Sequence, residues 1–547
     1  MHRSPAHTTV AFALAGLAFV APRLAEACGC FAPPTPAQPV VQAGERIVFA
    51  HEDGKVVAHI QIQYQGDAAE FAWLVPLPSV PELRLGSEEM FTQLDNATAP
   101  QFLLNQTGFC GGGGGISFGC GAAESFSARG DFPPEFQEPV AVDAGAAGPY
   151  DYAVVRADEK QPMLDWLNEN RFFVPDGTAA AMDPYIRPGS YFLALRLRSG
   201  ESAGSIQPVV LEYESDFPMV PIILTSVAAV PDMGVLVWVL GEHRAVPHNY
   251  QHVVINEEYI DWVNGAANYG TVVARAIDEA EGGHAFVTEY AGSTSPMRGI
   301  LDDPQRFGSR EYLEAASTPG QLVGRVLGLS FPWAPVQAVL QKYLPMPAEA
   351  RADGVQPQDY YQRLDFYLPN YDPSAEVDIA AVVADLWERI VEPTLEAGQL
   401  FNDHPMVTRF YTTLDPEEMS KDPVFAFNPD LPEVSRVHQA TMENTCEEGD
   451  AQFILHLDDG RAFNLEAPAD FALRDKTGLP RARIVQVLRQ EGDPEVVVDN
   501  RAALDAAAEV EAGGGCRSTS DRRSGMASLA LMFLVVGLGR RVLRRRA

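Results

Sequence analysis

The carboxyl end of the chain constrains its architecture most strongly. Residues 524–539 form an uncharged, mainly apolar run, and five arginines follow between Arg540 and Ala547. This run gives about 24 Å of helix, and adding residues 540–543 brings it to about 30 Å, the thickness of a bilayer's hydrocarbon core. Arginines favour the cytoplasmic side of a membrane. We therefore predict a transmembrane helix over 524–543, a cytoplasmic basic end, 544–547, and an ectodomain on the other side.

The amino terminus has the pattern of an export signal. An apolar segment, Thr8–Ala21, is followed by the small–x–small pattern of a signal-peptidase site, Ala25–Ala27. This predicts a signal peptide over 1–27 that is cleaved after Ala27. Cleavage there leaves Cys28 first, so a lipidated amino terminus is an alternative, although the two residues preceding Ala27 do not fit a lipobox. Either way the mature protein is predicted to be periplasmic or extracellular.

A cysteine flanked by glycines precedes the apolar carboxyl-terminal run. The segment Gly513–Arg517 contains three glycines followed by Cys516. Together with the apolar run and the Arg-rich end, it resembles the MYXO-CTERM sorting tail of myxobacteria and their relatives. This resemblance implies processing near Cys516 and anchoring at the cell surface. A permanent single-pass anchor is the alternative.

The remainder of the chain is long enough for several domains. The protein has 547 residues, of which 46% are hydrophobic and 21% charged, so it can bury a substantial core. We expect a mainly β exported region over 28–300, an α-rich or mixed exported region over 301–504 and a linker over 505–523. At roughly 100–200 residues per domain, the exported part corresponds to two to four domains.

The exported part is strongly acidic. The whole chain has a net charge of −34, but 10 of its 40 basic and only 2 of its 74 acidic residues lie in 1–27 and 517–547. The part between them therefore carries about −42. A surface of this charge repels phosphate backbones, so we predict no nucleic-acid binding. Divalent cations, or basic partners among other envelope components, are favoured instead.

Six cysteines are expected in an oxidising compartment. Cys110 and Cys120 flank a Gly-rich loop that is flexible enough to let them meet, so we predict a disulfide between them. Cys446 is a candidate for a long-range bridge to Cys28 or Cys30. Spacing alone does not fix the remaining pairing.

The amino-terminal half has the alternation of antiparallel strands. Asp53-Gly54 is typical of a type I′ hairpin turn, because both turn positions need positive φ. After the turn, alternate residues such as Ala58 and Ile60 face one way, and His59 faces the other. We expect His59 on an exposed or edge-lining polar face.

The second half has more helical spacing. Its clearest helix is predicted over Pro373–Glu392, and Pro393 is expected to end it. Strand signals return at Phe453–Leu457. The predicted fold class is α+β: a mainly antiparallel sheet with inserted helices in the amino-terminal half, a more helical second half and one carboxyl-terminal transmembrane helix.

Three histidines form the best candidate metal site. His243, His248 and His252 lie four or five residues apart, and imidazoles at such spacing can converge on Zn²⁺. Pro247 and a preceding strand pattern place them in a loop, however, and the spacing does not match a helical His-Glu-x-x-His motif. Solvated loop histidines are the plainer interpretation.

An acidic group offers a second, weaker possibility. Its carboxylates supply the hard oxygens that Ca²⁺ prefers, but no ordered calcium-loop motif arranges them. No Gly-x-Ser-x-Gly elbow is present, and we assign no catalytic residue and no required cofactor. The members of the acidic group are Asp415, Glu417, Glu418, Asp422 and Asp430.

Several long segments resemble an uncharacterised bacterial exported family, domain of unknown function 2330. The likeness extends over about residues 28–460 and implies an exported location and one shared architecture. It transfers no catalytic residue, because no activity is assigned to the family. The segments include Cys28–Cys30, Glu45–Phe49, His59–Gly66, Phe71–Pro81, Ala229–Glu242, Phe286–Ala291 and Arg409–Met419.

These observations favour a non-enzymatic binding or structural module of the cell envelope, anchored by its carboxyl-terminal helix. A metal-assisted envelope hydrolase that uses His243, His248 and His252 is the alternative. A structural precursor processed at Cys516 is a third interpretation.

Overall fold

The computed structural model describes residues 41–52, 54–65, 72–107, 141–172, 177–198, 206–371, 377–444, 453–465 and 478–512. In this part of the chain, no helix has the length and apolar character needed to cross a membrane. Several predicted features lie outside the described residues and stay predictions. They are the signal peptide with Ala27, the cysteines (Cys28, Cys30, Cys110, Cys120, Cys446 and Cys516) and the segment 524–543.

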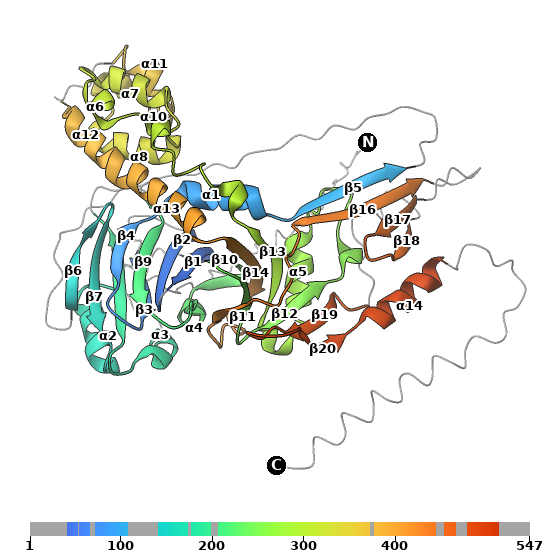
Figure 1. The fold of residues 1–547 in the computed structure, drawn as a ribbon. Coiled ribbons are helices and arrows are strands. Elements are labelled where there is room, and N and C mark those ends of the chain that lie inside the picture. The colour runs from blue at the N-terminus through green and yellow to red at the C-terminus, as the bar shows by residue number, and fades with distance from the viewer. Residues whose placement is uncertain are drawn as a thin grey trace, which may run out of the picture.

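A ten-stranded central sheet takes strands from both halves of the chain (Figure 1). β1 and β2 form the predicted antiparallel hairpin, and Gly54 in its turn has a φ of +76°. β1 pairs in parallel with β10, and β12 with β13, whereas the other neighbours are antiparallel. The strands, in sheet order, are β20 (Glu495–Asp499), β19 (Ala482–Val487), β12 (Gln251–Ile255), β13 (Ala285–Ser293), β14 (Met406–Leu414), β10 (Ala229–Gly241), β1 (Val41–Glu52), β2 (Lys55–Gln65), β9 (Val209–Glu214) and β4 (Glu82–Leu85).

A second, four-stranded antiparallel sheet packs against the β1–β2–β9 part of the central sheet. Its order is β3 (Ala72–Leu77), β8 (Tyr191–Leu197), β7 (Tyr150–Arg156) and β6 (Ala141–Ala147). The two sheets share the largest hydrophobic core, which includes Phe49 of β1, Trp73 of β3 and Leu193 of β8. Helix α2 (Lys160–Glu169) contributes Trp166 to it.

Two helices cover the opposite face of the central sheet, which we call the helix-covered face. They are α1 (Glu88–Thr98) and α13 (Glu392–Asp403), whose Phe91 and Phe401 pack with Trp238 of β10. Buried charges also lie there. Arg409 of β14 binds both Asp95 of α1 (2.7 Å) and Glu289 of β13. Because the acidic and basic groups are paired, their burial is compatible with a stable core.

The helices between residues 310 and 386 form a lobe with its own hydrophobic core (Figure 1). Of the helix predicted over 373–392, the part from Ile379 onward is present, as α12 (Ile379–Leu386) and a π-helical turn, Trp387–Val391, whereas residues 373–376 lie outside the described residues. The expectation that Pro393 ends this helix is wrong. The chain stays helical from the π-helical turn through Glu392 and Pro393 into α13, so the proline lies inside a continuous helical run, directly after the π-helical turn. The lobe helices are α6 (Arg310–Glu314), α7 (Pro319–Leu327), α8 (Trp333–Tyr343), α9 (Ala348–Ala352), α10 (Pro357–Gln362), α11 (Leu364–Tyr367) and α12 (Ile379–Leu386).

The carboxyl-terminal part returns to β structure. A third sheet has the order β18 (Ala462–Leu465), β17 (Phe453–Leu457), β16 (Val437–Asn444) and β5 (Gln101–Thr107), with β5 and β16 parallel. Helix α14 (Arg501–Ala512) follows β20. The linker predicted from residue 505 therefore begins as helix, because this Ala-rich stretch has high helix propensity and buries Leu504 and Ala508.

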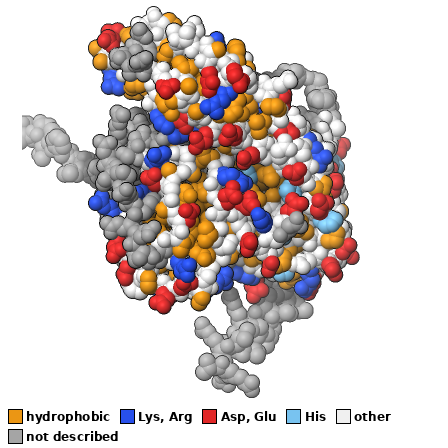
Figure 2. Space-filling model, turned by 60° about the vertical axis from the view of Figure 1, so that its left-hand side comes forward, with side chains coloured by type: hydrophobic (Ala, Val, Ile, Leu, Met, Phe, Trp, Pro, Cys, Tyr) orange, Lys and Arg blue, Asp and Glu red, His pale blue; other side chains and the backbone are white. Residues whose placement is uncertain are grey.

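The α+β class is confirmed for the described residues, with sheets dominating the first half. The boundary predicted at residue 300 falls between strands of one sheet, since β14 pairs with both β10 and β13. Figure 2 shows acidic and basic side chains interspersed over the face in view, with hydrophobic side chains between them.

Candidate functional site

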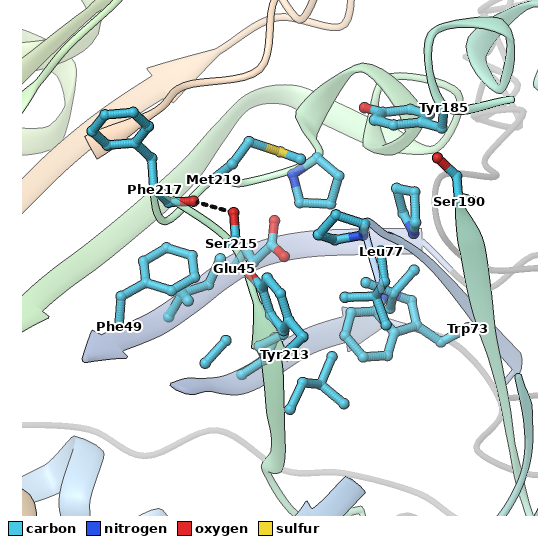
Figure 3. Close-up of a pocket in the computed structure, with 18 of the residues that line it drawn as sticks. Glu45, Phe49, Trp73, Leu77, Tyr185, Ser190, Tyr213, Ser215, Phe217 and Met219 are labelled. Atoms are coloured by element: carbon cyan, nitrogen blue, oxygen red, sulfur yellow. Dashed lines mark hydrogen bonds between the residues drawn. The ribbon is translucent and has the colours of Figure 1, made fainter. Parts of the chain in front are cut away.

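A pocket lies between the central sheet and the second sheet, on the face of β1 and β2 that is turned away from α1 and α13 (Figure 3). We call it the interlayer pocket. Its volume is about 120 Å³. An apolar cavity of about 150 Å³ holds a ligand as large as benzene, so this pocket has room for a small organic group. Its lining includes Glu45, Phe49, Trp73, Tyr185, Tyr213 and Phe217.

Glu45 places a carboxylate in this otherwise apolar environment. Alternation along β1 directs Glu45 to the same face as Ile47 and Phe49, and only 3% of Glu45 is exposed. Figure 3 shows its carboxylate projecting among the labelled side chains at the centre of the pocket. Among the residues lining the pocket, Glu45 is the only acidic one and Arg187 the only basic one. A buried carboxylate costs free energy unless hydrogen bonds or a positive charge compensate it.

Three buried aromatic residues form the walls of the pocket. Phe49 and Trp73 are each 2% exposed, and Tyr213 of β9 is 8% exposed. Burial raises the pKa of Tyr213 above its usual range, so its phenol is neutral at physiological pH. The indole N–H of Trp73 is buried and has no acceptor among the described residues. Aromatic walls with a few polar groups are typical of small-molecule binding sites.

The polar groups at the rim are held by local hydrogen bonds. The Tyr185 hydroxyl donates to Asp422 Oδ1 (2.8 Å), and Ser215 Oγ donates to the Phe217 carbonyl oxygen (3.0 Å). Ser190 Oγ accepts from Arg187 Nε at 3.1 Å. Neither serine bond involves a general base, so these contacts activate neither hydroxyl as a nucleophile.

Asp422 connects the rim to the predicted acidic group. Burial raises the pKa of Asp422 to about 6, although its hydrogen bonds from the Ile223 amide and from Tyr185 act in the opposite direction. At neutral pH the carboxylate accepts both bonds and fixes the position of Tyr185. The sequence pattern identified this residue, but for calcium rather than for support of a pocket.

The other members of the predicted acidic group that make hydrogen bonds accept them mainly from backbone amides. Asp415 Oδ1 accepts from the Asp232 amide (2.9 Å), Glu418 Oε2 from the Asp415 amide (2.9 Å) and Asp430 Oδ2 from the Gly492 amide (2.8 Å). The described residues contain no group of three or more His, Cys, Asp or Glu side chains that would hold a metal ion. A calcium site involving Asp415, Glu417, Glu418, Asp422 and Asp430 stays a prediction.

The three candidate zinc ligands are placed differently from one another. His243 is exposed in the turn after β10, and His248 is exposed after β11 (Arg244–Pro247). His252 is buried in β12, where Nε2 accepts from the Thr288 amide at 3.2 Å and burial lowers its pKa to about 3. The structure does not group the three, and the zinc hypothesis also stays a prediction. His248 stacks on the pocket residue Phe217, with ring centroids 5.9 Å apart.

The expectation for His59 is wrong. His59 is only 4% exposed, on the helix-covered face, and burial together with the positive charge of Arg84 lowers its pKa to about 3. The alternation of β2 was predicted correctly. The helices that cover this face, however, come from residues 88–98 and 392–403, far from His59 in the sequence.

Comparison with protein families gives one match. The model of a family described as "Uncharacterized protein conserved in bacteria (DUF2330)" matches residues 22–305. The chain belongs to this family. The match confirms the resemblance found in the sequence and includes every strand that lines the interlayer pocket. Comparisons with curated proteins and with solved structures give no match. The likeness beyond residue 305, and that of the tail to MYXO-CTERM, stay predictions.

Sequence analysis missed Glu45 as a candidate site residue. It named Glu45–Phe49 only as one of the segments that resemble the family, and one signal was available there. Glu45 interrupts a row of side chains on one face of the strand that continues with Ile47 and Phe49. The aromatic partners Trp73 and Tyr213 come from distant strands, so no local pattern joins them to Glu45.

Proposed function

We propose that this member of the DUF2330 family is an exported binding module whose ligand site is the interlayer pocket. The observation that supports this most is the buried carboxylate of Glu45 among the aromatic walls of a pocket large enough for a small organic group. Such a pocket combines apolar contact area with a few orienting polar groups, as ligand sites do. The ligand enters the pocket, contacts Phe49, Trp73 and Tyr213, and is released unchanged.

Binding without chemistry is favoured by the rim geometry. Ser190 and Ser215, the two serines that line the pocket, are engaged by Arg187 and by a backbone carbonyl. Tyr185 is held by Asp422, and Tyr213 is kept neutral by burial. These groups orient the ligand and exclude water, but their contacts supply no activated nucleophile.

We further propose that the module acts at the outer side of a membrane, held there by residues 524–543. The apolar run, the five terminal arginines and the export pattern at 1–27 support this location. Full-length protein is expected in the membrane fraction after alkaline carbonate extraction. A variant lacking 524–547 is expected in the soluble exported fraction. Full-length protein in the cytosol with its first 27 residues retained would contradict the proposal.

A pocket-filling substitution tests the site itself. Ala58 lines the pocket and is 1% exposed, so Ala58→Leu is expected to occupy the ligand volume. Ala50→Leu is the matched control, because Ala50 is equally small and buried but lies on the helix-covered face. Each change is expected to lower the free energy of unfolding by about 1–3 kcal/mol through overpacking.

Ligand-observed NMR on the purified full-length protein in maltoside detergent gives the readout. The small neutral alcohol 3,3-dimethylbutan-1-ol is expected to show saturation transfer with the wild type and with Ala50→Leu. The signal is expected to disappear with Ala58→Leu. Equal signals from Ala58→Leu and the wild type would place binding elsewhere and overturn the proposed site.

A further inference from the structure

We propose that the interlayer pocket selects a small uncharged ring compound with a carbonyl group, whose oxygen accepts a hydrogen bond from the indole N–H of Trp73. This inference rests on the proposed function and adds the chemical class of the ligand. Cyclic ketones belong to this class. The donor of Trp73 is the main argument, and the charges and walls of the lining narrow the class further.

Trp73 places a buried hydrogen-bond donor in the wall of the pocket. Trp73, Val75 and Leu77 alternate along β3 and all line the pocket, so this face of the strand is turned toward it. Only 2% of Trp73 is exposed, and its N–H has no acceptor among the described residues. Figure 3 shows its ring among the other side chains of the pocket. A buried donor without an acceptor costs free energy, which a hydrogen bond to a ligand oxygen would offset.

Two other buried tryptophans have acceptors within the protein. Trp238 Nε1 donates to Thr98 Oγ1 at 2.9 Å, and Trp262 Nε1 donates to the carbonyl oxygen of Glu257 at 3.1 Å. Neither ring lines the pocket. Of these three indole donors, the one without an acceptor is therefore the one at the pocket. Because buried polar groups are normally hydrogen-bonded, this exception points to a partner from outside the chain.

The charged groups of the lining favour an uncharged ligand. Glu45 already interacts within the protein, and Arg187 Nε donates to Ser190 Oγ at the exposed rim. Burial keeps the phenol of Tyr213 neutral. An ion that enters this space would lose its hydration without gaining a free counter-ion. A ketone loses hydrogen bonds to water but gains one from Trp73, so its transfer is far less costly.

The size and the walls of the pocket favour a ring. The volume is about 120 Å³, close to that of a cavity that holds benzene. Phe49, Trp73 and Tyr213 offer flat surfaces on which a ring packs with a large contact area. A ketone also accepts hydrogen bonds without donating any, so it brings no donor of its own that would need an acceptor in this mainly apolar space.

A pair of isosteric ligands separates the hydrogen bond from shape. Cyclohexanone and methylenecyclohexane differ in one group, a C=O in the first and a C=CH2 in the second, and have nearly the same volume. Saturation-transfer titration of the full-length protein in maltoside detergent gives both dissociation constants. Trp73→Phe removes the N–H and is expected to weaken cyclohexanone by about tenfold relative to methylenecyclohexane. Partition of each ligand into micelles is the same for both proteins and cancels in this ratio.

Trp262→Phe is the matched control. It makes the same substitution at a tryptophan that is 3% exposed in a different hydrophobic core, so the wild-type ratio of the two ligands is expected to persist. Indole N–H signals of the wild type give a direct readout. Of the six tryptophans, all in the described part of the chain, only Trp73 lines the pocket. Cyclohexanone is therefore expected to move one indole proton downfield, whereas methylenecyclohexane is not. If Trp73→Phe does not fold, this spectrum decides the question.

The outcomes distinguish this inference from the function on which it rests. Binding of both ring ligands with an unchanged ratio in Trp73→Phe, or without the downfield shift, would overturn the hydrogen bond to Trp73 and leave the binding module intact. Tighter binding of cyclohexylammonium or cyclohexanecarboxylate than of cyclohexanone would overturn the uncharged class. Binding of 3,3-dimethylbutan-1-ol without binding of cyclohexanone would overturn the inference alone. Binding of none of these ligands would overturn the proposed function as well.

Discussion

The two faces of β1 differ in how completely they are filled. Arg46 lies on the helix-covered face, where it binds Asp95, donates to Gln61 at 2.9 Å and lies over the Trp238 ring. On this face, side chains of α1 and α13 pack directly on the sheet. Its neighbour Glu45 points to the other face, where the interlayer pocket leaves a space of about 120 Å³ with a mainly apolar and aromatic lining. We therefore expect substitutions on the first face to change mainly the stability of the fold, and substitutions in the pocket to change mainly the proposed binding.

The largest expected loss of stability comes from removing the arginine of a buried ion pair on the helix-covered face. Arg409→Ala leaves the buried carboxylate of Glu289 without its cation, and the free energy of unfolding is expected to fall by about 3–5 kcal/mol. Arg489→Ala is the control, because the Arg489–Glu495 pair is exposed and such pairs contribute less than about 1 kcal/mol. Urea denaturation measures both. Similar losses in the two variants would mean that the buried network does not hold this face together.

His59, on the same face, makes the stability of the protein depend on pH. Its pKa is lowered to about 3, so the unfolded chain takes up a proton below pH 6.5 while the folded protein does not. Stability from this group is therefore lost as pH falls, by about 2 kcal/mol between pH 7 and pH 5. His59→Asn is expected to reduce the difference in urea midpoint between these pH values. An unchanged difference would show that His59 titrates normally.

Asp422, which holds Tyr185 at the rim of the pocket, has the opposite effect on how stability depends on pH. Its pKa is raised to about 6, so the folded protein binds a proton more readily than the unfolded chain, and stability from this group rises as pH falls from 7 to 5. Its partial exposure to solvent reduces the effect to below about 1 kcal/mol. Asp422→Asn is expected to make the protein more acid-sensitive than the wild type in the same urea experiment. A variant that is less acid-sensitive than the wild type would contradict a raised pKa of Asp422 in the folded protein.

The smallest expected change is at Glu45 itself. Glu45→Gln keeps the shape of the side chain and its capacity for hydrogen bonds, so the free energy of unfolding is expected to change by less than about 1 kcal/mol. The melting temperature of the ligand-free protein provides the measurement. A loss as large as that of Arg409→Ala would assign Glu45 to the stability of the fold instead of to recognition.

Local patterns predicted the local elements of this fold. The Asp53-Gly54 signal and the alternation of β2 gave the hairpin, and apolar spacing gave the helix that contains Val382 and Leu386. The parallel pairing of β1 with β10 joins residues 187 to 190 positions apart, and no short pattern encodes it. His59 was misplaced for the same reason, because the helices that bury it are distant in the sequence.

The candidate site was less accessible to sequence reasoning. The histidine spacing drew attention to His243, His248 and His252, yet the folded chain buries only the last of them. Glu45 was visible as an acid that interrupts an apolar face, but its meaning depends on Trp73 and Tyr213 from other strands. Sequence analysis therefore predicted the hairpin that carries part of the site, but it did not predict the pocket.

Titration of the full-length protein with 3,3-dimethylbutan-1-ol, in the wild type, Ala58→Leu and Ala50→Leu, tests the central claim most directly. The account predicts saturable binding at one site in the wild type and in Ala50→Leu, and no binding in Ala58→Leu. Heat signals for the wild type no larger than those of dilution would contradict the claim that the interlayer pocket is a binding site.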